Sequence, residues 1–550
     1  MGRLGAYRGP IAIVVVVVVA VVAFVLVGGG GDDDDSGDTA SGGQDSSSGG
    51  GEADAEFPGI GTEEALANPQ CDAESGLVKI PTFRRPQCVK EWPEGEDNGG
   101  ATSPGVTGES IKVVVRIPST TEPEAEEVIR QEGQNAFDMV ADHLETWGRD
   151  WELVFHKASG EDEAAQRADA TEIANDIQPF AAVSNSSTGA FPVWEAELAA
   201  RGVVVFGWVQ SWEDQQAQPG YRWSFFLDDR LRLTHTAEYI GKRLAGSPAR
   251  WAGDEALQDQ ERKFAVVYSE ESTMDIDYLR ERLAEHDVEP LVIAHPMGEA
   301  EQASHARTAV ARMKEEGVTT VVSLFEFGYG AALTEQAQAD GFSPEWFVTG
   351  HGASDTNVLS RTLNQEQWRH AFGIGGINLQ VRGEVNYNNR LYQWHYGRQP
   401  GPEASAALGQ LWTPAQFLTN GVHLAGPNLT PETLQEALFG MEPFGGSWDD
   451  SRVEIGFSFG DDIGVDWDDY SGQDDMAEKW WDPDTVGVDE VGAEDAGMWW
   501  QLDNGRRYRV GEWPEGEPEM FSTEGATTFL ESYPEGDAPP DYEHVPKSPS

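Results

Sequence analysis

Strand and helix patterns alternate along the middle of this 550-residue chain, and this alternation restricts its fold more than any other feature. Residues 111–115, 151–156, 179–183 and 203–206 are short apolar runs typical of buried strands, and stretches with helical spacing separate them. Strands joined by helices lie parallel in one sheet, with helices on both of its faces. The sequence therefore predicts an α/β fold built on parallel sheets.

The same alternation occurs a second time. After a crossing segment at 225–229, strand patterns return at 264–268, 290–294, 319–324 and 346–349. We therefore expect two Rossmann-like lobes joined by a hinge. Ligands of open α/β sheets bind outside the carboxyl ends of the strands, so two such sheets facing each other would form a cleft between them.

A hydroxyl-rich loop follows one of the predicted strands of the first lobe. Residues 184–189 read Ser-Asn-Ser-Ser-Thr-Gly and come directly before a predicted helix. Backbone N–H groups at a helix N-terminus hold anionic groups, and hydroxyls add further donors. The loop is thus a candidate for binding a solute, although the same residues also suit simple capping of the helix.

The N-terminus indicates export. Arg3 and Arg8 precede an apolar run at 11–27, which is the layout of an export signal and only just long enough to span a membrane. The following Gly/Ser/Asp-rich stretch suits a flexible tether. We expect an uncleaved membrane anchor in preference to a cleaved signal, and a buried core helix is the alternative.

Net charge limits the possible partners, and cysteine content limits the possible disulfides and metal sites. The formal net charge of −59 argues against binding to nucleic acid or to an anionic membrane surface. Cys71 and Cys88 are the only cysteines, and in an oxidising compartment we expect them to form a disulfide. Two separate buried thiols are the alternative, and the spacing rules out a CxxC metal or redox site.

Three motifs, taken in order, resemble the type I periplasmic binding proteins. They are the segment 105–115, the Ser-Ser-Thr-Gly loop, and Ala406-Ala-Leu-Gly409 with the helix that ends at 425–431. The nearest branch is the branched-chain amino acid substrate-binding proteins of ATP-driven importers. The disulfide segment and the motifs at 479–483 and 506–513 further resemble extended exported members from high-GC Gram-positive bacteria.

The resemblance implies roles for particular residues. It gives Ser186, Ser187 and Thr188 the task of holding the polar head of the ligand, and Glu326 the task of pairing with a ligand ammonium group. Neighbouring cleft residues would be Trp208, Gln210, Phe325 and Phe327. Trp208 departs from the small residues usual at its position, which argues against an amino-acid ligand.

His351, after a predicted strand, is a further candidate for the cleft, with a structural loop histidine as the alternative. Motifs of hydrolases, phosphate-binding loops and zinc peptidases are absent from the sequence, so we expect no catalytic residues, no cofactor and no bound metal.

The C-terminal part is acidic and rich in tryptophan. Its tryptophans suit either stacking on sugars or packing of a loop-rich extension onto the second lobe. Asp461, Asp462, Asp466, Asp468 and Asp469 suit a solvated acidic face, because their spacing does not fit a calcium-binding loop.

The sequence divides into eight predicted segments. They are a signal or anchor (1–30), an acidic linker (31–58), a disulfide-containing extension (59–104), the first part of lobe 1 (105–228), the first part of lobe 2 (229–345), a return to lobe 1 with closing helices of lobe 2 (346–445), the Trp-rich extension (446–533) and a flexible tail (534–550).

The function implied is capture of a small polar solute by hinge closure, followed by delivery to the permease of an ABC importer. The solute would be an amino acid, an amide or urea, or a short-chain acid. Predicted hinges lie near 225–229, near 341–350 and after Gly373. The alternatives are a surface sensor that uses the same cleft, and an adhesion or scaffold protein.

Overall fold

The structure is a computed structural model that describes residues 57–544 except 94, 185–191, 273, 297, 383–386, 446–450, 453, 459–462, 491 and 535–537. The predicted membrane anchor and most of the acidic linker therefore lie outside the described residues. Among the helices that are described, none has the length and apolar character needed to cross a membrane.

Lobe 1 is built on a five-stranded parallel sheet with the order β4-β3-β5-β6-β7. Its strands are β3 (Ser110–Ile117), β4 (Asp150–Lys157), β5 (Ala181–Val183), β6 (Val204–Gly207) and β7 (Arg222–Ser224). Its helices are α3 (Pro123–Ala141), α4 (Glu163–Glu172), η1 (Ile173–Ile177), α5 (Pro192–Ala199), α6 (Trp212–Ala217), α14 (Tyr387–Tyr396), α15 (Pro402–Ala425) and α16 (Pro431–Phe439).

Alternating strand residues explain why helices cover both faces of this sheet. In β3, Ile111 and Val113 belong to the core shared with α3 and α15, whereas Val114 belongs to the core shared with α4 and α5. A strand whose successive side chains are all buried needs an apolar layer on each side. The predicted doubly covered sheet is confirmed.

Lobe 2 repeats this plan. Its parallel strands are β8 (Phe264–Ser269), β9 (Leu291–His295), β10 (Thr320–Leu324), β11 (Glu345–Val348) and β12 (Ala371–Gly375). Its helices are α7 (Asp229–Tyr239), η2 (Ile240–Leu244), α8 (Glu255–Gln258), α9 (Ile276–Ala284), α10 (Glu299–Glu316), α11 (Phe327–Ala339), η3 (His351–Ala353), α12 (Asn357–Ser360) and α13 (Gln365–Trp368). Numbered within each lobe, both parallel sheets have the strand order 2-1-3-4-5.

The C-terminal extension completes the sheet of lobe 2. β15 (Met476–Val488) pairs antiparallel with β12, and β16 (Glu494–Gln501) and β17 (Arg507–Tyr508) pair with β15. The sequence analysis described this stretch only as loop-rich. Trp480, Trp481, Trp499 and Trp513 are buried in the cores of lobe 2, which agrees with the packing interpretation of the tryptophans.

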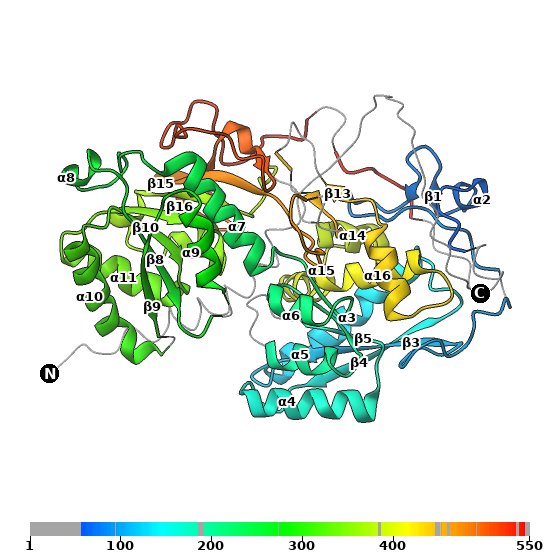
Figure 1. The fold of residues 1–550 in the computed structure, drawn as a ribbon. Helices are drawn as coiled ribbons and strands as arrows, with labels where there is room; N and C mark the ends of the chain where they lie inside the picture. The colour runs from blue at the N-terminus through cyan, green and yellow to red at the C-terminus, as the bar shows by residue number, and fades with distance from the viewer. Residues whose placement is uncertain are drawn as a thin grey trace.

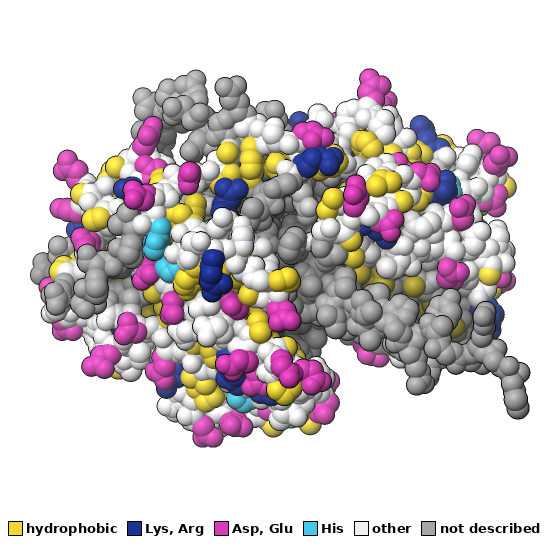
Figure 2. Space-filling view, turned by 180° about the vertical axis from the view of Figure 1, so that it is seen from behind, with side chains coloured by type: hydrophobic (Ala, Val, Ile, Leu, Met, Phe, Trp, Pro, Cys, Tyr) yellow, Lys and Arg dark blue, Asp and Glu magenta, His cyan; other side chains and the backbone are white. Residues whose placement is uncertain are grey.

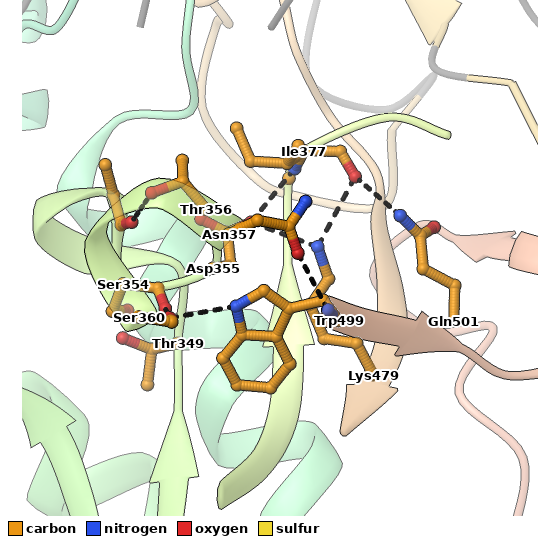
Figure 3. Close-up of polar contacts among 12 residues, drawn as sticks. Thr349, Ser354, Asp355, Thr356, Asn357, Ser360, Ile377, Lys479, Trp499 and Gln501 are labelled. Atoms are coloured by element: carbon orange, nitrogen blue, oxygen red, sulfur yellow. Dashed lines mark hydrogen bonds and ion pairs between the residues drawn. The ribbon is translucent and has the colours of Figure 1, made fainter. Parts of the chain in front are cut away.

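A buried polar cluster joins the extension to the rest of lobe 2 (Figure 3). The Lys479 ammonium in β15 lies 3.2 Å from Asp355 Oδ2, and that oxygen accepts a hydrogen bond from the Ile377 N–H at 3.0 Å. A Cβ atom at Gly375 would lie 2.2 Å from Asp355 Oδ2, so only glycine allows the carboxylate to approach β12 this closely.

The return to lobe 1 comes later than predicted. β11 and β12 continue the sheet of lobe 2, so the chain crosses back after Gly375 and not at residue 346. The helices that follow also differ from the prediction, because α14 and α15 pack against α3 of lobe 1 and α16 packs against α15. Figure 1 shows them over lobe 1, while β15 and β16 lie in lobe 2 on the left.

The N-terminal extension packs on lobe 1 and contains α2 (Glu63–Leu66), β1 (Cys71–Asp72) and β2 (Leu77–Val78). The predicted disulfide between Cys71 and Cys88 is present. Val78, Ile80 and Val89 from this extension contribute to the main core of lobe 1. The extension is therefore part of the folded lobe.

Candidate functional site

Three crossing segments meet between the lobes. The carboxyl end of β7 leads into the first crossing, at 225–228, and the carboxyl end of β12 leads into the second. Residues 470–473, on the third crossing, contact both. Ser471 Oγ lies 3.0 Å from Ser224 Oγ, and Gln473 Nε2 donates to the Gly376 carbonyl at 2.7 Å. The strands of both sheets thus end on the side of the molecule where the crossing segments run. A ligand cleft is expected at these carboxyl ends.

On the lobe 1 side, the residues predicted to hold the solute are those of the Ser/Thr loop. Ser186, Ser187 and Thr188 lie outside the described residues. The flanking elements are described, with β5 ending at Val183 and α5 beginning at Pro192. The predicted strand, loop and helix order around these residues is therefore present, and their role in binding stays a prediction.

A buried polar network joins β7 to α5 and α6. Arg222 Nη1 is 2.8 Å from Asp214 Oδ2, Arg222 Nη2 is 3.4 Å from Glu195 Oε2, and Arg222 Nε donates to Gln210 Oε1 at 2.7 Å. Burial raises the pKa of Glu195, while the charge of Arg222 acts in the opposite direction. Gln210 therefore supports Arg222, a structural role that the sequence analysis did not assign to it.

Trp208 is fully buried in the core of lobe 1. Its ring packs against Phe225 and Phe226, with centroid distances of 5.7 and 5.8 Å. Packing of this kind explains the tryptophan without a ligand, so we do not include Trp208 in the proposed binding set.

On the lobe 2 side, the structure brings two predicted residues together. Glu326 follows β10 and His351 follows β11, and their side chains meet with Glu326 Oε1 3.3 Å from His351 Nε2. The Glu326 side chain is 38% exposed and that of His351 is 21% exposed. The hydrogen bond from His351 is the main reason why the pKa of Glu326 lies below its usual value.

The two phenylalanines beside Glu326 have different environments. Phe325 is buried in the core of lobe 2, so it does not form the predicted wall of the cleft. Phe327, the first residue of α11, is only partly buried. Phe327 can therefore contact a solute next to Glu326, whereas Phe325 only supports the loop.

His295 is a neighbour of this pair that the sequence analysis missed. Its Nε2 accepts a hydrogen bond from the Glu326 N–H at 3.4 Å, and its ring stacks on Tyr329 with centroids 3.9 Å apart. Burial lowers the pKa of His295, which favours the neutral ring. The available signal was a polar residue at the end of a strand, but the predicted strand stopped one residue earlier.

A surface depression of about 510 Å³ lies elsewhere in lobe 2. Phe264, Gly241 and His286 line it, and Phe264 is the first residue of β8. It is therefore at the amino edge of the sheet, opposite Glu326. The edge that carries Glu326 and His351 remains the better candidate.

Two parallel sheets with the same strand order, joined by three crossings, are the plan of the type I periplasmic binding fold that the sequence predicts. No protein-family model matches this chain, and no curated protein is similar to it in sequence.

Solved structures of the type I fold resemble this chain at low sequence identity. A solute-binding protein from Rhodopseudomonas palustris in complex with p-hydroxybenzoic acid has 11% identity and a TM-score of 0.48, covering 73% of this chain and 98% of its own. A branched-chain amino acid binding protein from Streptococcus pneumoniae in complex with isoleucine has 14% identity and a TM-score of 0.43, covering 72% and 100%. A substrate-binding protein from Sphaerobacter thermophilus has 12% identity and a TM-score of 0.47, covering 74% and 99%.

These three structures cover 72–74% of this chain, which is longer than each of them. Its surface is strongly acidic. Figure 2 shows acidic side chains scattered over both lobes, with no continuous patch of Lys and Arg on the face drawn.

Proposed function

We propose that this protein captures a small polar solute outside the cytoplasm and delivers it to the permease of an ABC importer. The observation that carries the proposal is the meeting of Glu326 and His351 at the carboxyl edge of lobe 2, beside the crossing segments. Closure of the lobes around a solute would add contacts from the Ser186–Thr188 loop that the open form lacks. A ligand that gains contacts only in the closed form shifts the population toward it.

The chemistry of the edge supports a ligand with hydrogen-bond donors. Glu326 is ionised and partly exposed, and a carboxylate accepts hydrogen bonds from an ammonium, amide or urea group. Phe327 supplies apolar surface next to it. On the other lobe, hydroxyls and the N-terminus of α5 suit a carboxylate or a carbonyl oxygen. An amino acid, an amide or urea, or a short-chain acid fits this arrangement.

The proposed location rests on the N-terminal segment and on the disulfide. The apolar run at 11–27 would hold the protein at the outer face of the membrane, with the acidic linker as a tether. The Cys71–Cys88 bond suits an oxidising compartment. A tethered lobe pair stays close to a permease in the same membrane.

Glu326→Gln is expected to weaken binding of the best solute by about 10- to 100-fold, because it removes one charge-assisted hydrogen bond worth roughly 1.5–3 kcal/mol. A thermal-shift screen of amino acids, amides, ureas and short-chain acids would identify the solute, and calorimetry would measure its affinity. Ser187→Ala with Thr188→Ala should abolish binding.

The matched control is Glu315→Gln, which removes an exposed carboxylate from α10. An affinity that is unchanged in Glu326→Gln would show that the binding edge is elsewhere. If no solute stabilises the wild-type protein, the scaffold interpretation would replace the transport interpretation.

A further inference from the structure

Three histidines from distant parts of the chain meet where the C-terminal segment lies on lobe 1. His143 follows α3, His395 lies in α14, and His544 is close to the C-terminus. One ring nitrogen from each histidine lies within 4.8 Å of the nitrogens from the other two. The cluster is separate from the proposed solute site, because its members belong to the outer helices of lobe 1 and to the C-terminal segment.

Neighbouring side chains fix which ring nitrogen of two histidines faces the cluster. Gln70 Oε1 lies 3.2 Å from His143 Nδ1, and an amide oxygen only accepts, so the proton is on Nδ1 and the lone pair on Nε2. Asp142 Oδ2 lies 3.5 Å from His395 Nε2, which leaves Nδ1 of His395 as the nitrogen with the lone pair. A carboxylate or carbonyl oxygen on the far nitrogen is the usual support of a metal-binding histidine.

Two of these nitrogens have no other use among the described residues. His395 Nδ1 and His544 Nε2 are both buried and lack a hydrogen-bond partner in the described part of the chain. A buried polar atom without a partner costs free energy. A metal ion would remove that cost by taking both lone pairs.

The surroundings shield the cluster from water. The His143 residue is only 1% exposed, and the His395 side chain is 8% exposed. The Trp394 ring packs on His143 with centroids 4.5 Å apart and on His544 with centroids 5.0 Å apart. A pocket lined by several imidazoles favours ions such as Zn²⁺ over Ca²⁺ or Mg²⁺, which take oxygen ligands.

Contacts just before His544 hold the C-terminal segment in place. The Tyr542 hydroxyl donates to Asp72 Oδ2 at 2.8 Å, next to the Cys71–Cys88 disulfide. The Trp394 Nε1–H donates to the Tyr542 carbonyl at 2.6 Å. The position of His544 is therefore set by the fold and by direct hydrogen bonds to lobe 1.

We propose that His143, His395 and His544 bind one zinc-type transition-metal ion, which fastens the C-terminal segment to lobe 1. Three imidazoles around a tetrahedral ion at about 2.0 Å place their nitrogens about 3.3 Å apart. Side-chain rotations that move each ring nitrogen by about 1 Å would bring the three nitrogens from their present spacing to that geometry. A water molecule would fill the fourth position.

The test is Zn²⁺ binding by the full chain, purified without a polyhistidine tag and stripped of metal with EDTA. The calorimetry is done in excess Ca²⁺. The Ca²⁺ occupies the carboxylates of the acidic surface, so that only Zn²⁺ binding to a nitrogen-rich site is measured. We expect one tight site per chain, and at least a 100-fold loss of Zn²⁺ affinity in each of His143→Ala, His395→Ala and His544→Ala. With Co²⁺ as probe, the visible absorption should show tetrahedral coordination.

His286→Ala is the matched control, because it removes a histidine of lobe 2 and should leave the affinity unchanged. Hydrogen exchange gives a second readout, in which Zn²⁺ should slow exchange at Tyr542 and Glu543 in the wild type but not in His544→Ala. A tight site that survives all three substitutions, or the absence of any tight site, would overturn the proposal. Binding without slower exchange would overturn the fastening role.

Discussion

Lys479→Met is expected to lower the free energy of unfolding by about 3–5 kcal/mol, because it leaves a buried carboxylate without its counter-ion. Lys479 is fully buried and Asp355 is 3% exposed, with 3.2 Å between Nζ and Oδ2 (Figure 3). The Lys479 ammonium also donates to the Ile377 carbonyl at 3.4 Å. Methionine fills a similar volume but donates no hydrogen bond to Asp355 Oδ2 or to the Ile377 carbonyl oxygen. Urea unfolding followed by tryptophan fluorescence measures the change.

The matched control is Lys263→Met. Lys263 pairs with Glu316 on the surface, and their side chains are 47% and 50% exposed, so the loss should stay below about 1 kcal/mol. Asp355→Asn combined with Lys479→Met should recover part of the stability, because a neutral amide oxygen still accepts from the Ile377 N–H. If Lys479→Met costs no more than the control, the pair does not hold β15 in lobe 2.

Stability is also expected to fall as the pH rises from about 4 to about 7, owing to buried carboxyls at the crossing segments. Asp228, Asp469 and Asp474 are 1%, 1% and 5% exposed. Burial raises the pKa of Asp228 to about 7, and burial together with neighbouring carboxylates raises the pKa values of Asp469 and Asp474. The expected solvated acidic face is therefore wrong for Asp469.

The sign follows from proton binding in the two states. The folded protein keeps protons on these groups at pH values where the unfolded chain, with aspartate pKa values near 3.9, has lost them. Unfolding then releases protons, so raising the pH favours the unfolded state. For Asp228 alone the loss is on the order of 4 kcal/mol between pH 4 and pH 8, because one pKa unit corresponds to about 1.4 kcal/mol.

Asp228→Asn should remove this part of the pH dependence. Asparagine stays neutral, and its side-chain oxygen can still cap α7 by accepting from the Leu231 N–H, as Asp228 does at 2.7 Å. We expect greater stability than the wild type at pH 8 and equal stability at pH 4. Asp162→Asn, at the exposed N-cap of α4, is the control and should leave the slope unchanged. A wild-type curve without a fall between pH 4 and pH 7 would contradict the prediction.

The parallel sheets could be predicted because their signal is local. Strands such as Val204–Gly207 are short apolar runs between helical patterns, and a strand followed by a helix and a parallel strand has one favoured handedness. The pairing of Glu326 with His351 follows from the same logic, since each residue comes after one of two neighbouring strands, β10 and β11. The Cys71–Cys88 bond was likewise predictable, from the absence of any other cysteine.

Contacts between distant segments could not be predicted. The pairing of Phe372 in β12 with Trp480 in β15 depends on tertiary packing that no local pattern records. The direction of a side chain within a loop was equally hidden. Phe325 and Glu326 are adjacent, yet the Phe325 side chain is buried in the core of lobe 2 and the Glu326 side chain is partly exposed. The hydrogen bond between Gln210 and Arg222 depends on how the loop after β6 lies against β7, which no local pattern records.

The interleaving of the two lobes has a consequence for biogenesis. One of the two layers that cover the sheet of lobe 1 is incomplete until α15 has been synthesised, and the outer edge of β12 has no partner until β15 follows. Translocation from the N-terminus would therefore deliver two unfinished cores, including an open sheet edge that invites aggregation. The cores of both lobes therefore stay incomplete until most of the chain has been synthesised.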